Sequence, residues 1–499
     1  MKNKLSINII FSLFLQIIAI VNSFITTKIT ILYFGTEING LISSINQFLN
    51  YVSLLEGGIG AVVMANLYRP LYEHNMVHVS NIIESSRKFF RQIIYIYMGY
   101  VVILSFFYPM VTKTNMSTAS VALLIWILSI SLSAQYFFAI SYKILLQADH
   151  KLYICSIIQI IAYILNIIFV ILSSIYLKNI VLVKLLSSCA FLMQPLLYTI
   201  IVKKIYSIKK SEKKETYQLK GRWDGFFQNL AFFINNNTDI VLITFFLNLN
   251  EVSVYSVYML VINGMKSVIL SISSGFQSVL GRALASQDIN KLENFFEKYF
   301  YIIMILSIFG FGTAIMLVRS FVLVYIGSNA DYHYDRIVFP IVIALSQMVI
   351  CIREPLNLLI ISANKFKETN KGAAFEAILN IVISMVLLKV YGLVGVAVGT
   401  LIASVCRLSY FVVYLRKNII YLDYKKIIKP FAFAIIYIAI LICIYLNFKT
   451  ISCLNWLYFL KRSLITVLLN LIFVIILLFI FWPSGLKEIA RLCGKRLKK

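Results

Sequence analysis

The sequence predicts an all-α polytopic membrane protein with about fourteen transmembrane helices. Hydrophobic residues make up 61% of the 499 residues, and they fall into long blocks near the roughly 20 residues that span a bilayer core. Only 13% of the residues are charged, and most of these lie between the blocks. Lys and Arg gather on alternate connections, which is the pattern that membrane topology imposes.

The apolar blocks set the expected spans. Each block carries few charges over a length that a helix needs to cross the hydrocarbon region. The predicted spans are residues 7–33, 38–66, 89–109, 121–142, 152–177, 181–202, 226–247, 252–278, 299–326, 337–362, 373–390, 393–415, 427–446 and 464–482.

The basic residues predict the orientation. We assign 33 of the 46 Lys and Arg residues to the side of the N-terminus, 7 to the opposite side and 6 to the spans. Cytoplasmic loops carry the excess of Lys and Arg, so both termini are expected in the cytoplasm.

Composition argues against several other classes of function. The net charge of +26 is spread over short loops, where topology and anionic lipid headgroups explain it without nucleic acid. The seven cysteines show no CxxC pair, the four histidines form no HExxH motif, and no GxxxxGK[ST] motif occurs. We therefore expect no metal, no cofactor and no nucleotide-binding site.

The two halves of the chain repeat at an offset of about 214 residues. Glu37-Ile38-Asn39 aligns with Glu251-Val252-Ser253, and Asn166 aligns with Asn380. Six spans in each half give parallel repeats about an axis along the membrane normal. The repeat predicts two pseudo-symmetric six-helix bundles, with an N-terminal lobe at 1–205, a basic cytoplasmic linker at 206–225, a C-terminal lobe at 226–420, and two additional helices with a basic tail at 421–499.

Polar stripes follow spans one, two, seven and eight at helical spacing. Polar groups in a membrane helix are costly unless they face protein or water. Interhelical hydrogen bonding explains any single polar residue of this kind, but four matched stripes favour a polar cavity between the lobes. Candidate ligands in the stripes are Asn46, Asn50, Asn236 and Asn263.

Charged residues within the spans divide into candidate ligands and candidate ion-coupling groups. Lys266, Arg353, Arg407 and Arg319 are the cations that we expect to bind substrate, although structural ion pairs explain the arginines equally well. Asp239, Glu56 and Glu354 are candidates for ion coupling or for pairing with these cations. Glu376 is expected near the cytoplasmic mouth, where water would solvate it.

Several loose motifs give the chain a family resemblance. They are Thr238-Asp239, Val254-Tyr255-Ser256-Val257-Tyr258, Arg282, Ala363-Asn364-Lys365 and the turn Tyr391-Gly392-Leu393-Val394-Gly395-Val396-Ala397. With the fourteen-span layout, they resemble the polysaccharide transporters of the multidrug/oligosaccharidyl-lipid/polysaccharide exporter superfamily, above all O-antigen and capsule repeat-unit flippases. The resemblance implies a bacterial inner-membrane protein, a V-shaped pair of bundles, and a polyprenyl-pyrophosphate-linked oligosaccharide as substrate.

The resemblance and the polar stripes together predict a flippase that works by alternating access and is not an enzyme. Its expected partners are the lipid-linked glycan, membrane lipids, a coupling H⁺ or Na⁺ and other polysaccharide-assembly proteins. The alternatives are a cation-coupled multidrug antiporter, a lipid II flippase and, from another class, a membrane glycosyltransferase or polymerase. The last would need larger outer loops with acidic residues, and only Asp331 and Asp335 are available.

Overall fold

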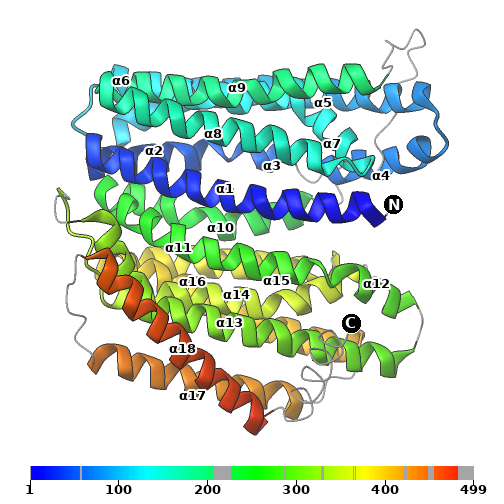
Figure 1. Ribbon diagram of the computed structural model, residues 1–499, viewed down its shortest axis with the longest axis vertical. Helices are drawn as coiled ribbons and strands as arrows, with labels where there is room; N and C mark the ends of the chain where they lie inside the picture. Colours follow the sequence, from blue (N-terminus) through cyan, green and yellow to red (C-terminus); the bar gives the residue numbers. More distant parts are fainter. Residues whose placement is uncertain are drawn as a thin grey trace. The chain divides into compact units, whose positions relative to one another are not determined.

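Every regular element in the described part of the chain is a helix (Figure 1). The computed structural model describes all residues except residue 1, residues 57–58, 207–225, 286–287 and 328–330, residues 364 and 366, and residues 421–423, 448–454 and 482–499. An all-helical chain is what a bilayer requires of a non-barrel protein, because every backbone donor and acceptor is satisfied within its own segment. The predicted all-α class is therefore confirmed.

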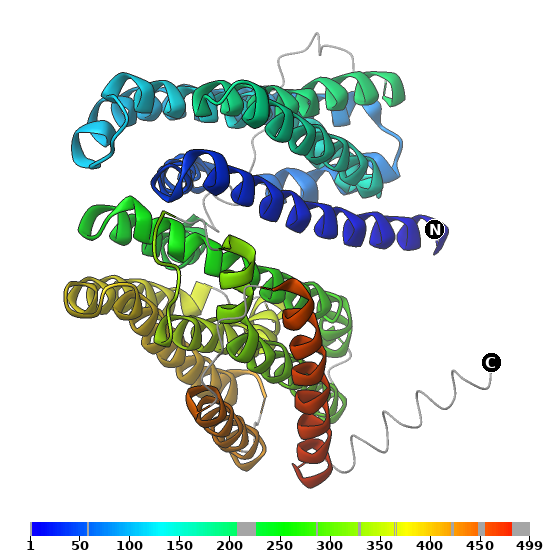
Figure 2. The same ribbon diagram turned by 60° about the vertical axis from the view of Figure 1, so that its left-hand side comes forward.

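The first half of the chain contains ten of these helices. The first is long and unbroken, as the dark blue helix in Figure 2 shows. In chain order they are α1 (Lys2–Phe34), α2 (Thr36–Leu49), α3 (Val52–Glu56), α4 (Ile59–Tyr72), α5 (Met76–Val111), α6 (Thr118–Ala134), the π-helix η1 (Gln135–Ala139), α7 (Ile140–Ala148), α8 (Leu152–Tyr176) and α9 (Ile180–Ile205).

The second half continues the pattern of long helices joined by short connections. In order they are α10 (Phe226–Phe246), α11 (Leu249–Ser274), α12 (Gln277–Ala285), α13 (Ile289–Ile326), α14 (Val338–Ser362), the 3₁₀ turn η2 (Lys367–Thr369), α15 (Asn370–Tyr391), α16 (Leu393–Asn418), α17 (Tyr424–Asn447) and α18 (Trp456–Phe481).

The chain divides into two compact units. Unit 1 comprises Met1–Ser256 with Ala330–Tyr332, and unit 2 comprises Val257–Asn329 with His333–Lys499. Unit 1 therefore includes α10 and the first turns of α11. The predicted linker at 206–225 lies outside the described residues apart from Tyr206, and the division into six-helix lobes stays a prediction.

The chain is a multi-pass membrane protein. In the described residues, eleven helices are long and apolar enough to cross a membrane. Two shorter apolar helices, Asn237–Phe246 and Ala434–Leu446, fall within the predicted seventh and thirteenth spans. Eleven of the fourteen predicted spans then coincide with helices that run unbroken through them. The second, fourth and eighth spans are interrupted or altered, the eighth because α11 ends at Ser274 and α12 begins at Gln277.

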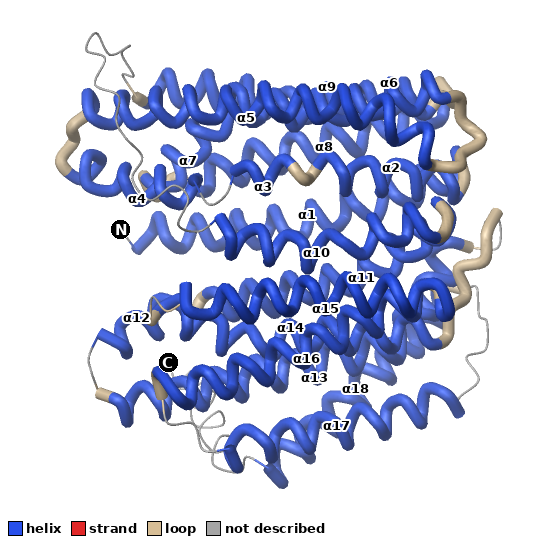
Figure 3. Tube along the Cα trace, turned by 180° about the vertical axis from the view of Figure 1, so that it is seen from behind, coloured by secondary structure: helices blue, strands red, loops and turns tan. Residues whose placement is uncertain are grey.

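The predicted second span, at 38–66, is wrong as a continuous helix. Figure 3 shows α2, α3 and α4 as separate helices. Near Asn50, backbone hydrogen bonds join residues three apart, as in a tight turn, and not four apart as in an α-helix. They run from Tyr51 N to Phe48 O at 3.1 Å and from Ser53 N to Asn50 O at 3.0 Å. Tyr100 donates its hydroxyl to Phe48 O at 3.0 Å and so satisfies a carbonyl that a regular helix would use. Apolar composition identifies a membrane segment but does not report whether its helix is continuous.

The predicted fourth span, at 121–142, contains a second irregularity. Its helix passes from α6 into the π-helix η1 at Gln135 and returns to α-helix in α7. A π-helix contains wider turns, is rare, and is frequent at functional sites. The hydrophobic pattern of the sequence does not predict this π-helix.

Helices α5 and α13 begin ten or more residues before their predicted spans, which started at residues 89 and 299. Helix α5 begins at Met76, after the N-cap Asn75, whose side chain accepts from His78 N at 3.0 Å. Helix α13 begins at Ile289, after the N-cap Asp288, whose side chain accepts from Lys291 N at 3.1 Å. Hydrophobicity marks only the part of each helix that suits lipid, whereas the capping residue sets where the helix starts.

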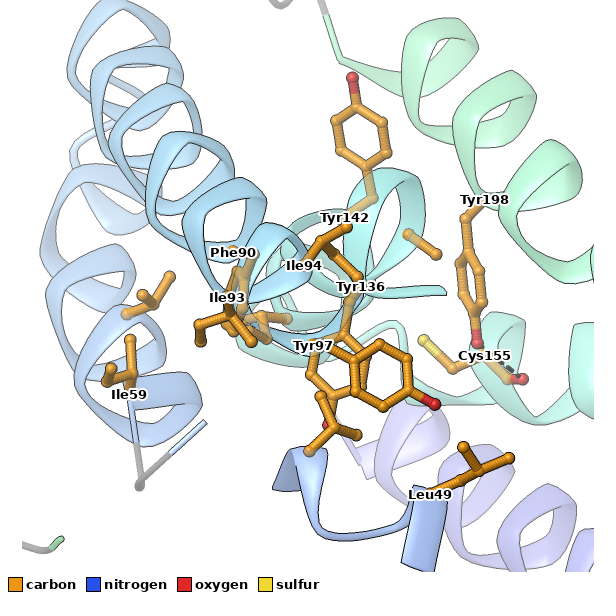
Figure 4. Close-up of a cluster of buried hydrophobic side chains, with 14 of the residues drawn as sticks. Leu49, Ile59, Phe90, Ile93, Ile94, Tyr97, Tyr136, Tyr142, Cys155 and Tyr198 are labelled. Atoms are coloured by element: carbon orange, nitrogen blue, oxygen red, sulfur yellow. Dashed lines mark hydrogen bonds between the residues drawn. The ribbon is translucent and has the colours of Figure 1, made fainter. Parts of the chain in front are cut away.

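A core of aliphatic and tyrosine side chains holds unit 1 together. Figure 4 shows Phe90, Tyr97, Tyr136 and Tyr198 among its buried members. Tyr198 donates its hydroxyl to the carbonyl of Cys155 at 3.4 Å. Aromatic rings bury large apolar areas, and their polar atoms need partners once they are inside.

In unit 2, the two C-terminal helices α17 and α18 pack against α13. Asn470 of α18 is buried and donates to Phe309 O at 3.1 Å and to Thr313 Oγ1 at 2.5 Å. In α13, a side chain at Gly312 would meet the Tyr437 hydroxyl of α17 at 3.0 Å, so the glycine permits close packing. The predicted two additional helices are thus anchored to the helix that would be the ninth span.

Candidate functional site

Helix α2 forms a polar and very close contact with α10 and α11 within unit 1. Asn39 Nδ2 donates to Ser253 Oγ at 2.7 Å, and the hydroxyls of Ser44 and Thr244 lie 2.8 Å apart. A side chain at Gly40 would lie 1.7 Å from Leu249 O, so the two backbones touch. Small residues allow this approach, and polar side chains then bond across it.

The next turn of α2 continues the contact into the asparagine-rich part of α10. Gln47 Nε2 donates to Asn237 O at 3.1 Å and to the Asn237 side chain. Asp239 and Tyr255 are both buried, and the Tyr255 hydroxyl donates to Asp239 Oδ2 at 2.8 Å. Part of the predicted polar stripe on spans two, seven and eight is therefore used in contacts between helices.

The predicted asparagine ligands have different surroundings. Asn263 is exposed on α11, one of the helices long and apolar enough to cross a membrane. Asn46 is exposed on α2, and Asn50 is exposed in the turn that follows α2, both within the predicted second span. The side chain of Asn236 lies outside the described residues. An exposed amide in a membrane-spanning segment is costly against lipid, so these three suit a water-filled face. Their role in substrate binding stays a prediction.

Lys266 is held by a residue that the sequence analysis did not select. Its ammonium donates to Gln347 Oε1 of α14 at 2.9 Å within unit 2. Further along α14, Asn357 Nδ2 donates to Glu354 Oε2 at 3.3 Å. Lys266 and Glu354 are both half-buried, and Glu354 lies close enough to Lys266 for an electrostatic interaction.

Two of the predicted cations share one carboxylate. Glu376 of α15 forms an ion pair with Arg353 of α14, and its Oε2 lies 3.7 Å from Arg407 Nε of α16. Arg407 also donates to Thr369 O at 3.0 Å, and its guanidinium lies 4.3 Å from the Phe411 ring centroid. Glu376 is only 6% exposed, so our expectation of a solvated residue at the mouth was wrong. The charge of Glu376 is offset by Arg353 and Arg407 and not by water.

Arg319, the fourth predicted cation, forms an ion pair at the loop that follows α13. Its Nε and Nη2 donate to Asp335 at 2.5 Å and 2.9 Å. The hydrogen bonds from Arg319 lower the pKa of the Asp335 carboxyl below its ordinary value. A role for Arg319 in substrate binding stays a prediction.

Glu56 lies at the end of α3, beside the π-helix. Tyr136 of η1 donates its hydroxyl to Glu56 Oε2 at 3.1 Å. The predicted acid is thus placed where two irregular segments of unit 1 meet. Neither irregularity has a signal in the hydrophobic pattern, which is why the sequence analysis chose Glu56 for its charge alone.

Several residues that pair with the predicted site residues were not themselves predicted as site residues. Gln47, Gln347 and Tyr255 are uncharged, and Glu376 lies near the end of a span. Gln347 lies in the same span as Arg353, so a search for amides within spans would have found it. The pairing itself joins residues far apart in the chain and has no local signal.

The fold is similar to the folds of a lipid II flippase and of multidrug transporters of the MATE family. Three solved structures illustrate the likeness. "Lipid II flippase MurJ, inward closed conformation" matches with a TM-score of 0.71 and 19% identity, over 96% of this chain and 99% of that one.

The other two are drug transporters. An inward-facing multidrug resistance MATE family transporter of the MOP superfamily matches with a TM-score of 0.65 and 13% identity, over 80% of this chain and 96% of that one. A structure of the MATE multidrug transporter DinF-BH matches with a TM-score of 0.59 and 15% identity, over 85% of this chain and 97% of that one. At these identities the likeness shows the fold. No protein-family model and no curated protein matches the sequence.

Proposed function

We propose that the chain is a flippase for a polyprenyl-pyrophosphate-linked oligosaccharide, an O-antigen or capsular repeat unit. It moves this substrate from the cytoplasmic to the outer leaflet of the bacterial inner membrane by alternating access between two pseudo-symmetric six-helix lobes. Sugars and a diphosphate cannot cross about 30 Å of hydrocarbon unaided, so the protein supplies polar groups and countercharge while the lipid tail stays in the bilayer.

The observation that carries the proposal is the extent of the structural match. The flippase structure covers 96% of this chain, whereas the two drug-transporter structures cover 80% and 85%. The chain therefore extends beyond the drug-transporter fold but not beyond the flippase fold. This favours a lipid-linked glycan over a drug as the substrate.

Lys266 supports a phosphate-bearing substrate. It lies on α11 three residues after the exposed Asn263, and its partner Gln347 is a neutral amide. A lysine ammonium suits an anionic group, and lysine is a common phosphate ligand. Arg353 and Arg407 both bind Glu376, so their guanidinium groups already have an acid partner, and we rank Lys266 first among the substrate ligands.

The proposal includes a coupling ion, H⁺ or Na⁺. Asp239, Glu56 and Glu354 are the acids within the spans that we propose for this role or for pairing with the cations. Carboxylates in membrane segments commonly mark ion pathways. Membrane lipids and other polysaccharide-assembly proteins complete the proposed partners.

A lipid II flippase is the second candidate, favoured by the similarity to the solved structure of a lipid II flippase. Gene replacement distinguishes the candidates. We expect the chain to restore surface glycan in a strain that lacks its repeat-unit flippase, and not to restore growth when a lipid II flippase is depleted. The reverse result would replace our proposal with the second candidate, and drug resistance without either rescue would indicate a multidrug antiporter.

The proposed orientation has a separate test. Lys178, after α8, and Lys204, near the end of α9, are exposed and lie at opposite ends of the α9 helix. With both termini in the cytoplasm, Lys178→Cys should react with an impermeant thiol reagent in intact cells and Lys204→Cys should not. Labelling of Lys204→Cys alone would show that the chain has the opposite orientation, and the proposed direction of transport would then be wrong.

A further inference from the structure

Two irregular helical segments meet in unit 1. One is the connection between α2 and α3, where backbone hydrogen bonds at Asn50 and Tyr51 join residues three apart. The other is the π-helix η1. Broken and π-helical turns in membrane helices recur at ion sites and hinges. The side-chain link between them is the hydrogen bond from Tyr136 to Glu56 at 3.1 Å.

Glu56 lies in surroundings where its ionised form is costly. Its Oε1 would be 3.1 Å from a side chain at Gly60, so the carboxylate lies against the first turn of α4. Nearby Tyr136 and Tyr97 belong to the buried core, and Tyr97 is fully buried (Figure 4). An ionised carboxylate among apolar groups needs charge or donors to offset its lost hydration.

The groups that face this carboxylate offer limited compensation. Tyr136 donates one hydrogen bond, and Lys143 of α7 interacts with Glu56 through charge. The Tyr97 hydroxyl is buried and has no partner in the described residues. Other titratable or charged groups on the elements packed around it include Tyr51 of the α2–α3 connection, Tyr100, Arg87 and Arg91 of α5, and Tyr142 of α7. Helix α10 also packs against α3, and its Asp239 accepts from Tyr255.

Most of those remaining groups are already committed elsewhere. Tyr100 bonds to Phe48 O, and Arg87 Nη1 donates to the Tyr142 hydroxyl at 3.2 Å. Arg91 lies 5.4 Å from the Phe137 ring centroid. The ionised form of Glu56 is therefore stabilised by one tyrosine hydroxyl and one lysine. Addition of one proton to the carboxylate removes the charge that these two groups stabilise.

We propose that Glu56 and Tyr136 form a proton-binding site whose occupancy sets the position of α3 against the π-helix. This deepens the proposed function, on which it rests, by naming the coupling ion and its site. In the binding step, hydronium transfers a proton to the Glu56 carboxylate, which yields a carboxylic acid and water. The neutral acid no longer requires the Tyr136 donor or the Lys143 charge, so the link that joins the two irregular segments weakens.

The other two acids are less suited to this role. Asp239 accepts from Tyr255 in a buried contact between α10 and α11. Glu354 accepts from Asn357 on its own helix, so its protonation would change no contact between helices through that bond. Glu56, by contrast, accepts from the π-helix, which is an irregular segment of another predicted span.

Hydrogen–deuterium exchange on the full-length protein in lipid nanodiscs tests the proposal without any substrate. Exchange of peptides covering residues 51–56 and 135–139 is measured across a pH series and corrected for intrinsic exchange. We expect the protection of both peptides in wild type to fall by about tenfold as pH decreases. A tenfold change corresponds to a difference of about one unit between the pKa of Glu56 in the closed and open forms of the two segments. The acidic form should expose the two segments together.

Matched variants make the test specific. Glu56→Gln should hold protection of both peptides constant across the pH series. Tyr136→Phe keeps the ring but removes the donor, so its transition should move to higher pH, because the ionised carboxylate loses a bond. Glu84→Gln, at a half-exposed acid on α5 near Lys88, is the control and should behave as wild type.

Each outcome has one meaning. A pH-dependent transition that persists unchanged in Glu56→Gln, or one that does not move in Tyr136→Phe, would overturn the site. If Glu56→Gln does not fold, the shift in Tyr136→Phe still decides. Rescue of surface glycan by the wild-type gene is measured separately. If rescue fails but the pH-dependent exchange transition is observed, the flippase proposal is wrong and the proton-binding site is still supported.

Discussion

Asn39 donates a hydrogen bond to Ser253 at 2.7 Å, and these two residues, 214 positions apart, align with each other in the predicted repeat. In a two-fold arrangement, equivalent positions meet only at the axis. The adjacent acids behave alike, since Glu37 accepts from Asn115 N at 2.7 Å and Glu251 accepts from the Tyr332 hydroxyl at 2.8 Å. In each case, the acid in the first turns of the helix binds a connecting loop.

A disulfide across this contact should stop transport. Alternating access requires α2 and α11 to separate at one end, whereas the contact between Asn39 and Ser253 holds them together. In a cysteine-free background, Asn39→Cys with Ser253→Cys should form a disulfide and abolish surface-glycan export, and a reductant should restore it. The disulfide is detected by a mobility shift, and export by glycan staining.

Single variants supply the control for the crosslink. Asn39→Cys and Ser253→Cys alone lose one hydrogen bond, worth about 1 kcal/mol, and should retain export. Full export by a quantitatively crosslinked protein would show that the contact stays closed throughout transport. The pair would then be a fixed part of the fold.

Lys266 should be required for transport but not for folding. We expect Lys266→Ala to abolish export at near-normal abundance, because removing a lysine from a membrane helix favours insertion by roughly 2.5 to 3.5 kcal/mol. Lys266→Arg should retain partial export, since the charge remains on a differently shaped group. Export is compared with abundance by quantitative blotting.

Lys461 offers a matched control for Lys266. It is an exposed lysine within α18, so Lys461→Ala removes the same group from another membrane helix. We expect this variant to export glycan normally. If Lys266→Ala also exports normally, Lys266 has no part in binding the substrate, and Arg353 and Arg407 become the residues to test.

Helical class and most spans were predictable because membrane helices follow directly from composition. A long apolar run has no other stable structure in lipid, so the α8 and α16 helices lie close to their predicted bounds. Helix starts were less predictable. The Asn75 and Asp288 caps lie in polar segments, where hydropathy carries no information about where α5 and α13 begin.

The candidate site was predictable in residue type but not in pairing. Charges within spans are rare, so Glu56, Lys266 and Arg407 were identifiable from position alone. Whether an arginine faces a ligand or an acid depends on contacts between distant helices. Arg353 and Arg407 converge on Glu376, and that arrangement arises from the packing of α14, α15 and α16.

The ion cluster around Glu376 should matter for stability. Glu376→Gln leaves two buried arginines facing each other without a countercharge, and breaking a buried pair costs about 3 to 5 kcal/mol. We expect a large fall in thermal stability of the purified protein. Arg407→Gln in the same chain should restore part of the loss, because it removes one of the two unpaired charges.

The double variant separates repulsion from packing. Arg407 also contacts Phe411 and Thr369, so some loss should remain when both residues are replaced. A double variant that is no more stable than Glu376→Gln alone would show that the carboxylate acts through shape and hydrogen bonding. Thermal unfolding in detergent, followed by fluorescence, measures all three proteins.

The ion pair between Arg319 and Asp335 should give a pH dependence confined to acid. Hydrogen bonds from Arg319 hold the Asp335 pKa below its ordinary value, so the ionised carboxylate is the form that the fold favours. A lowered pKa contributes stability that is fully present above the unfolded pKa, about 3.9, and is lost as pH falls through the folded value. We therefore expect Asp335→Asn to be less stable than wild type at neutral pH.

The difference in stability between wild type and Asp335→Asn should shrink once the pH falls below about 4. Protonation of Asp335 then removes from wild type the same charge that the substitution removes. Arg319 is 14% exposed, so loss of its partner leaves a mostly buried guanidinium in both cases. Thermal unfolding of wild type and Asp335→Asn across this range measures the convergence, with Glu84→Gln as an acid whose side chain is also partly exposed. A gap between wild type and Asp335→Asn that stays constant into acid would mean that Asp335 acts through shape and that its ion pair contributes nothing.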